Sequence, residues 1–207
     1  MRQPHPALLF LILYSMFLPP CSFADTFTFK ADRMSGGRAS GKEITVLSGN
    51  AEVMSDNLLL RADRIELQGS NNQFIDCIGN VWGMEEEKEI MFQADRLRYD
   101  RELKIARLEG NCTLEDKKNE VVARGRFIEY DDQAELAVFQ IAVRLFKENM
   151  VCRSEYAFYQ RTEKLLDLSG FPVVYKKDDE FRADRIQVDL ESDDVIMQGS
   201  VSGSIKN

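Results

Sequence analysis

Residues 60–67 read Leu60-Arg61-Ala62-Asp63-Arg64-Ile65-Glu66-Leu67, and this pattern returns along almost the whole chain. Clear copies begin at Phe29, Phe92 and Phe181, and degenerate copies occupy residues 123–127 and 152–156. With the aspartate as origin, the copies sit at 32, 63, 95, 125, 154 and 184, which gives spacings of 31, 32, 30, 29 and 30. A period of about 30 residues indicates a repeat architecture in which one structural unit is stacked several times.

A second feature recurs in the same register, a glycine at positions 49, 79, 110, 170 and 199, with Ile141 near the remaining expected position. Around these glycines apolar and polar residues alternate strictly, as in the stretch from Ala106 to Glu115. Alternation of period two over eight or nine residues predicts a strand with one buried face. The glycine lies on the apolar face, where it lets the strand bend or a neighbour approach closely.

The Ala-Asp-Arg half of each repeat changes its inward parity. Leu58, Leu60 and Ala62 share one parity, whereas Ile65 and Leu67 take the other. A one-residue shift of this kind is typical of a β-bulge or a sheet corner. The aspartate then lies at the bend, where its carboxylate can accept hydrogen bonds from turn amides. A catalytic or metal-binding row of Asp32, Asp63, Asp95 and Asp184 is the alternative, but repetition in each clear copy favours an architectural role.

Connectors rich in turn-forming residues separate the halves, as at 35–37, 69–72, 116–119 and 192–194. They are short enough to be hairpins, and no long segment has a helical period. The sequence therefore predicts an all-β fold, an elongated antiparallel β-jelly roll or solenoid-like stack built from about six repeats of ~30 residues, with about twelve strands.

The first 24 residues differ from the rest. An apolar run from Ala7 to Leu18 follows Arg2, and Ser22-Phe23-Ala24 supplies small residues before Asp25. This pattern predicts a secretory signal peptide cleaved after Ala24, too short to span a bilayer, and leaves one β domain over residues 25–207. Lipidation at Cys21 is the alternative, although the proline before it fits a lipobox poorly. The chain is expected to be exported.

Export permits disulfides, and Cys77, Cys112 and Cys152 remain in the mature chain. If equivalent positions stack, Cys77 and Cys112 are offset by four residues, which is roughly 13 Å along a strand. A bridge needs Cα atoms within about 7 Å. These cysteines are therefore expected to be small buried hydrophobic residues rather than a disulfide pair.

Few residues suggest chemistry. The only histidine, His5, lies in the signal peptide, so the mature chain lacks a histidine triad and a histidine metal ligand. Residues 36–42 resemble a phosphate-binding loop, but Glu43 replaces the required Ser or Thr and a strand follows. The formal charge of −8 argues against a nucleic-acid partner. We expect no enzyme activity, no cofactor and no metal site.

The periodicity leaves an apolar interior, and it allows either a filled core or an open groove. A groove would bind acyl chains with about 0.8 kcal/mol per buried methylene. The residues predicted to line the interior are Leu47, Val53, Ile65, Leu67, Ile75, Val81, Leu97, Tyr99, Leu108, Leu114, Phe127, Phe139, Val143, Tyr156, Phe158, Leu168, Ile186, Val188 and Met197.

The export signal and the alternating Ala-Asp-Arg and hydrophobic-x-Gly-Asn units together resemble the OstA/LptA family, from about Phe29 to Gly203. The resemblance implies an open, V-shaped β-jelly roll in the periplasm, whose interior binds the lipid part of lipopolysaccharide or a related glycolipid. It also implies head-to-tail assembly into a bridge between inner-membrane and outer-membrane transport components with similar domains. The interior residues above become the lipid-contacting set.

The C-terminal segment from Val195 to Ile205 carries no charge, so it predicts an edge strand open to pairing. The assembly edge is expected to contain Val195, Met197, Val201 and Ile205. The alternative to lipid transport is a structural β-repeat protein that only polymerises in the envelope through its edges. That alternative predicts a filled interior and no lipid uptake.

Overall fold

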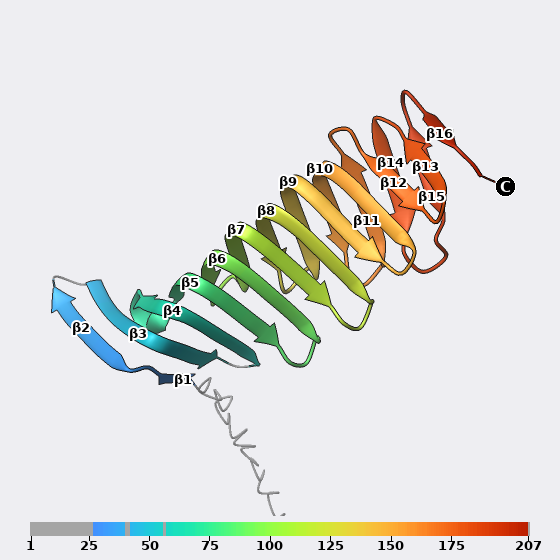
Figure 1. The fold of residues 1–207 in the computed structure, drawn as a ribbon. Coiled ribbons are helices and arrows are strands. Elements are labelled where there is room, and N and C mark those ends of the chain that lie inside the picture. The colour runs from blue at the N-terminus through green and yellow to red at the C-terminus, as the bar shows by residue number, and fades with distance from the viewer. Residues whose placement is uncertain (1–26, 40–41, 56, 207) are drawn as a thin grey trace, which may run out of the picture.

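The computed structural model describes residues 27–39, 42–55 and 57–206 (Figure 1). The predicted signal peptide and Cys21 lie outside the described residues. Apart from one short 3-10 turn, Ser70–Asn72, the regular structure is all strand. In chain order the strands are β1 (Phe27–Lys30), β2 (Arg33–Ala39), β3 (Lys42–Ser55), β4 (Leu58–Gln68), β5 (Phe74–Glu85), β6 (Ile90–Asp100), β7 (Ile105–Asp116), β8 (Val121–Asp131), β9 (Leu136–Lys147), β10 (Met150–Gln160), β11 (Leu165–Ser169), β12 (Val173–Lys176), β13 (Asp179–Arg182), β14 (Arg185–Asp189), β15 (Val195–Gln198) and β16 (Ser202–Ser204).

All sixteen strands belong to one antiparallel sheet, and β3 to β10 follow one another as hairpins along its length (Figure 1). Each pairing between these long strands shifts register once near the middle, for example between Ser48 and Ala51 where β3 meets β4. These bulges bend every strand at the same level and fold the sheet into two layers with an apolar face between them. The predicted all-β jelly roll built from stacked repeats is confirmed.

A recurring corner of aspartate and glycine forms the bend. Gly79 has φ of +77°, and a Cβ built on it would lie 2.5 Å from the Asp63 carboxylate oxygen Oδ2. The next residue, Asn80, donates its side-chain amide to the same oxygen at 2.9 Å. The first repeat has the same corner, in which Asn50 donates to Asp32 at 3.0 Å. The carboxylate occupies the space that glycine leaves, which is the architectural role predicted for these aspartates.

The two degenerate repeats lie one residue away from the predicted alignment. Glu155, not Ser154, occupies the aspartate position, because its backbone N–H donates to Gly170 O at 3.0 Å and its Cβ lies against that glycine. A one-residue shift exchanges the two faces of a strand. The inward orientation predicted for three residues is therefore wrong: Tyr156 is 47 % exposed, Phe158 is 45 % exposed, and Phe127 points outward and is half-buried.

The sheet divides into its two layers at both ends. In what we call the first layer, β1 pairs with the second half of β3, and β12, β13 and β16 continue from the first half of β10. In the second layer, β2 pairs with the first half of β3, and β11, β14 and β15 continue from the second half of β10. The stretch 35–37, predicted as a connector, lies within β2.

Candidate functional site

The interior between the layers is apolar along the described sheet, from Leu47 to Leu190. Fifteen of the nineteen residues predicted to line it are buried, and Met197 packs against the core from the end of the stack. Leu60, Ile90, Ile128, Leu145 and Tyr159 also lie in this core, although they are not among the residues predicted to line it. Ile128 and Tyr159 were missed because of the shifted alignment. Ile128 and Tyr130 alternate as Ile65 and Leu67 do, and aligning the two pairs places Ile128 in the interior.

Hairpin turns of the two layers meet along one long side of the interior, which we call the mouth. Contacts between these turns close the mouth. Arg101 Nε of the second layer donates to Ser55 Oγ of the first at 2.8 Å. Near the C-terminal end, Lys176 Nζ donates to the Asp193 carbonyl at 2.8 Å. Core residues such as Leu47, Ile65 and Phe139 are 0 % exposed. The interior is thus a packed core in this conformation rather than an open groove.

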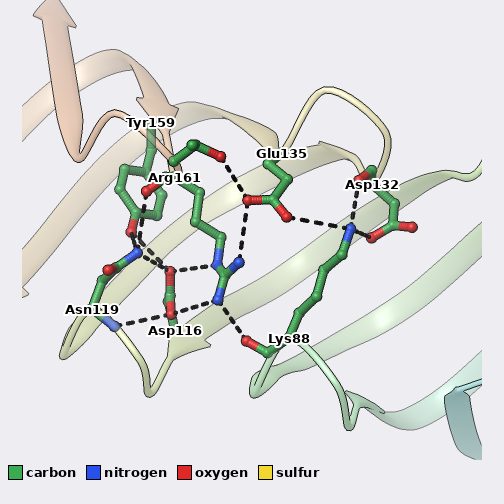
Figure 2. Close-up of polar contacts among 8 residues, drawn as sticks. Lys88, Asp116, Asn119, Asp132, Glu135, Tyr159 and Arg161 are labelled. Carbon is green, nitrogen blue, oxygen red and sulfur yellow. Dashed lines mark hydrogen bonds and ion pairs between the residues drawn. The ribbon is translucent and has the colours of Figure 1, made fainter.

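A cluster of charged residues, which we call the clasp, joins the two layers at the middle of the mouth (Figure 2). From the first layer, Lys88 Nζ lies 2.5 Å from Asp132 Oδ1 and 3.6 Å from Glu135 Oε1 of the second layer. Arg161, in the turn after β10, reaches across in the opposite direction and donates to the Lys88 carbonyl at 2.6 Å. The clasp consists of residues that Figure 2 labels: Lys88, Asp116, Asn119, Asp132, Glu135, Tyr159 and Arg161.

One link of the clasp is a buried ion pair. Arg161 Nε lies 2.8 Å from Asp116 Oδ2, and the two side chains are 6 % and 0 % exposed. Tyr159 donates its hydroxyl to the same carboxylate at 2.8 Å. Burial acts to lower the pKa of Arg161, but the hydrogen bond and charge of Asp116 outweigh it and hold the pKa above its ordinary value. Arg161 therefore stays charged, and parting the layers would require the buried ion pair to be separated and resolvated.

One buried polar group near the clasp has no partner among the described residues. Tyr130, on β8, is 5 % exposed, and its hydroxyl makes no hydrogen bond. Burial, followed by the charge of Asp132, raises the pKa of Tyr130, so its hydroxyl stays protonated and able to donate. A buried unpaired hydroxyl costs stability, so its presence at this position calls for an explanation.

The predicted assembly edge divides between two layers. Val195 and Met197 lie on β15 at the edge of the second layer and are half-buried against the core. Val201, 56 % exposed, precedes β16, and Ile205, 72 % exposed, follows it in the first layer. The expected single strand from 195 to 205 is therefore two strands, because the chain turns at Gly199, whose φ is +69°. Within the described sheet, β15 and β16 each have one strand neighbour.

Little in the described residues supports reaction chemistry. They hold no group of three or more metal-binding side chains. Cys77, Cys112 and Cys152 are free and buried, which confirms the expectation of small hydrophobic residues. Burial raises the pKa of the Cys112 and Cys152 thiols to about 12, so neither is a reactive thiolate. No helix in the part of the chain that the structure describes is long and apolar enough to cross a membrane.

Comparison with known proteins identifies the family. A solved structure entitled LptH, the LptA homologous periplasmic component of the conserved lipopolysaccharide transport device from Pseudomonas aeruginosa, is similar to 88 % of this chain over 96 % of its own length, with 12 % identity and a TM-score of 0.25. No curated protein sequence matches the chain. A family model described as OstA-like protein matches residues 25–181 of the 207. This chain therefore belongs to the OstA-like protein family.

Proposed function

We propose that this chain is a periplasmic bridge protein that binds the acyl part of lipopolysaccharide or a similar glycolipid between its two layers and passes it from the inner to the outer membrane. The observation that carries the proposal is the continuous apolar interior of an OstA-like chain, from Leu47 to Leu190. No catalytic step is part of this function.

Acyl chains have to enter by parting the layers, because the interior is closed. The mouth is the natural entry, since the contacts that close it are polar and can be replaced by water or by a lipid headgroup. Once the mouth parts, each methylene that enters the interior contributes about 0.8 kcal/mol. The Tyr130 hydroxyl lies unpaired near this entry and is suited to donate to an ester or amide carbonyl at the head of an acyl chain.

The lipid-contacting set that we propose contains the buried members of the predicted list, with Ile128, Leu145 and Tyr159 added. Phe127, Tyr156 and Phe158 are excluded because they face outward or are exposed. Assembly would join the N-terminal edges β1 and β2 of one copy to β15 and β16 of the next, so that two interiors become continuous. Similar domains of inner-membrane and outer-membrane components would cap the bridge.

Photo-crosslinking in the envelope tests this function. A photoreactive residue replaces Phe139 or Leu67, which are 0 % and 2 % exposed inside the interior, with outward-facing Glu109 as the matched control. We expect crosslinks to a glycolipid from the two interior positions and none from Glu109. A folded protein without lipid crosslinks would contradict the proposal.

The closed interior also supports the second candidate, an edge-assembling structural protein that carries no lipid. The core residues Leu47, Val53, Ile65 and Leu145 are 0 % exposed, as a purely structural core would be. The same crosslinking experiment separates the two functions, since both predict self-association and only the bridge predicts lipid contact.

A further inference from the structure

Three arginines form a row on the outer face of the first layer. In the strand register Arg124 of β8 is opposite Arg144 of β9, which is opposite Arg153 of β10. Their strand neighbours Ala123, Leu145 and Cys152 are 0 % exposed, so the three arginines all point outward, where they are exposed. With strands about 4.8 Å apart, the row is roughly 10 Å long.

The row is unneutralised. Among the described residues, no carboxylate lies within ion-pairing distance of Arg124, Arg144 or Arg153, whereas several outward arginines elsewhere on the sheet are paired. Examples of paired arginines are Arg61 with Glu52 at 2.8 Å, Arg107 with Glu129 at 2.7 Å and Arg185 with Asp167 at 2.9 Å. Like charges directly opposite each other destabilise a sheet. In a chain of net charge −8, such a row indicates an external anion that neutralises it.

Apolar side chains accompany the arginines on the same face. Phe146 and Tyr175 lie in the next row of side chains, and the guanidinium carbons of Arg124 and Arg153 lie 5.8 Å and 5.4 Å from their ring centres. Rings in these positions leave the guanidinium edges free to bind oxyanions. The surface is thus amphipathic as well as positively charged.

Exposed apolar residues also occupy the adjacent bends. Ile141 and Tyr156, at the bends of β9 and β10, are 54 % and 47 % exposed, and Phe171, two residues after β11, is 90 % exposed. Clear repeats carry polar residues at the position of Phe171, as at Asn50 and Asn80. Phe171 also has a φ of +58°, a backbone conformation that is costly for an aromatic residue. The degenerate repeats have therefore replaced polar corners with apolar ones next to the arginine row.

From the unneutralised arginine row and the exposed apolar bends beside it, we propose a docking surface for the phosphorylated headgroups of an anionic lipid surface. This surface consists of Arg124, Arg144, Arg153, Ile141, Tyr156 and Phe171. The arginines bind phosphate oxygens, and the apolar bend residues enter the interface beneath the headgroups. A line of charges on an extended sheet face matches several phosphates in one plane better than a single phosphate. The surface lies on the outside of the sheet and is distinct from the interior.

Vesicle flotation with residues 25–207, which contain every described strand, tests the proposal. The probes are vesicles of phosphatidylcholine with about 30 % phosphatidylglycerol, vesicles of phosphatidylcholine alone, and inorganic pyrophosphate. The test variant carries Arg124→Gln, Arg144→Gln and Arg153→Gln. The matched control carries Arg61→Gln, Arg107→Gln and Arg185→Gln, which removes the same charge from ion-paired positions. Circular dichroism melting confirms that both variants are folded.

We expect the native chain to float with anionic vesicles alone and to lose this binding as salt rises. The test variant should lose roughly a hundredfold in vesicle affinity, about fivefold for each arginine, while the control changes much less. Phe171→Ser should weaken vesicle binding more than Leu103→Ser, whose leucine is 57 % exposed at a distant turn. An equal loss in test and control variants would overturn the proposal. So would binding of pyrophosphate without binding of anionic vesicles, which would assign the row to a soluble phosphate.

Discussion

At the scale of single residues, the fold depends on pairs in which a carboxylate fills the space above a glycine. The glycine has two roles there, since its positive φ makes the bend and its missing side chain admits the acid. Gly79 and Asp63 illustrate both, with φ of +77° and 2.5 Å between Asp63 Oδ2 and the position that a methyl group on the glycine would take. Any side chain at this position would strain the backbone and displace the aspartate.

The substitution Gly79→Ala should therefore lower the free energy of unfolding by about 1–3 kcal/mol, through strain at positive φ and displacement of Asp63. Urea denaturation measures the change. Gly37→Ala is the control, because a Cβ there meets no atom within 4 Å and its φ is not positive, and it should change stability by less than about 0.5 kcal/mol. Equal effects of the two substitutions would contradict the corner.

Tyr130 gives a second prediction at this scale. Tyr130→Phe removes a buried hydroxyl without a partner, so the unliganded protein should keep its stability or gain about 1 kcal/mol. Binding of lipopolysaccharide should weaken by roughly tenfold if the hydroxyl donates to the lipid. Thermal melting and a lipid-binding titration provide the two measurements. A variant that binds lipid as well as the native protein would remove Tyr130 from the site.

Residue patterns predicted the corners correctly because Asp, Gly and Asn recur at fixed spacing in the clear repeats. The patterns failed in the two degenerate repeats, where Arg126 and Glu155 replace the aspartate. Arginines in these repeats matched the motif one residue too early, so the aspartate position was predicted at 125 and 154. Because side chains in a strand alternate between faces, that single-residue error placed Phe127, Tyr156 and Phe158 on the wrong face. The alternation of Ala157 and Tyr159, which are both buried, predicts the inward face of β10 correctly.

At the scale of strands and turns, contacts between elements could not be read from the sequence. Arg124, Arg144 and Arg153 are 20 and 9 residues apart in the chain, and only the strand register brings them into one row. The clasp has the same origin, because Asp116 and Arg161 meet only when the sheet folds into layers. Turn residues such as Lys88 and Glu135 carry no periodic signal that could reveal their partners.

Glu135 makes the clasp sensitive to acid. The hydrogen bond from Thr162, with the charges of Arg161 and Lys88, lowers the pKa of Glu135 below its ordinary 4.5. A lowered pKa in the folded state stabilises the protein above pH 4.5, and this stability is lost as pH falls through the folded value. Glu135→Gln should thus be about 1 kcal/mol less stable at pH 7, and the difference should shrink as the pH falls below 4.5.

Urea denaturation of the native and Glu135→Gln proteins at several pH values checks this. Glu102→Gln is a suitable control, because Glu102 is an exposed turn residue outside the clasp. A stability difference that stays constant between pH 7 and pH 3 would show that ionisation of Glu135 does not hold the layers together.

At the scale of the whole molecule, both ends of the stack present two strand edges, one in each layer. If β15 and β16 join the N-terminal edge of another copy, Val201→Asp combined with Ile205→Asp should reduce self-association at least tenfold, since both residues are exposed beside β16. Sedimentation at several concentrations measures the effect. Leu103→Asp adds charge at a distant exposed position and should leave association unchanged.

The central claim is that the closed interior opens at its mouth to admit acyl chains, and the distance across the mouth tests it most directly. Spin labels at Glu87→Cys and Gln133→Cys, exposed turns of opposite layers, report on this distance, while Glu87→Cys with Lys118→Cys reports within one layer. Cys77, Cys112 and Cys152 are at most 2 % exposed and should remain unlabelled. With lipopolysaccharide added, we predict a longer distance across the mouth and an unchanged distance within the layer. Unchanged distances for both pairs would contradict the claim.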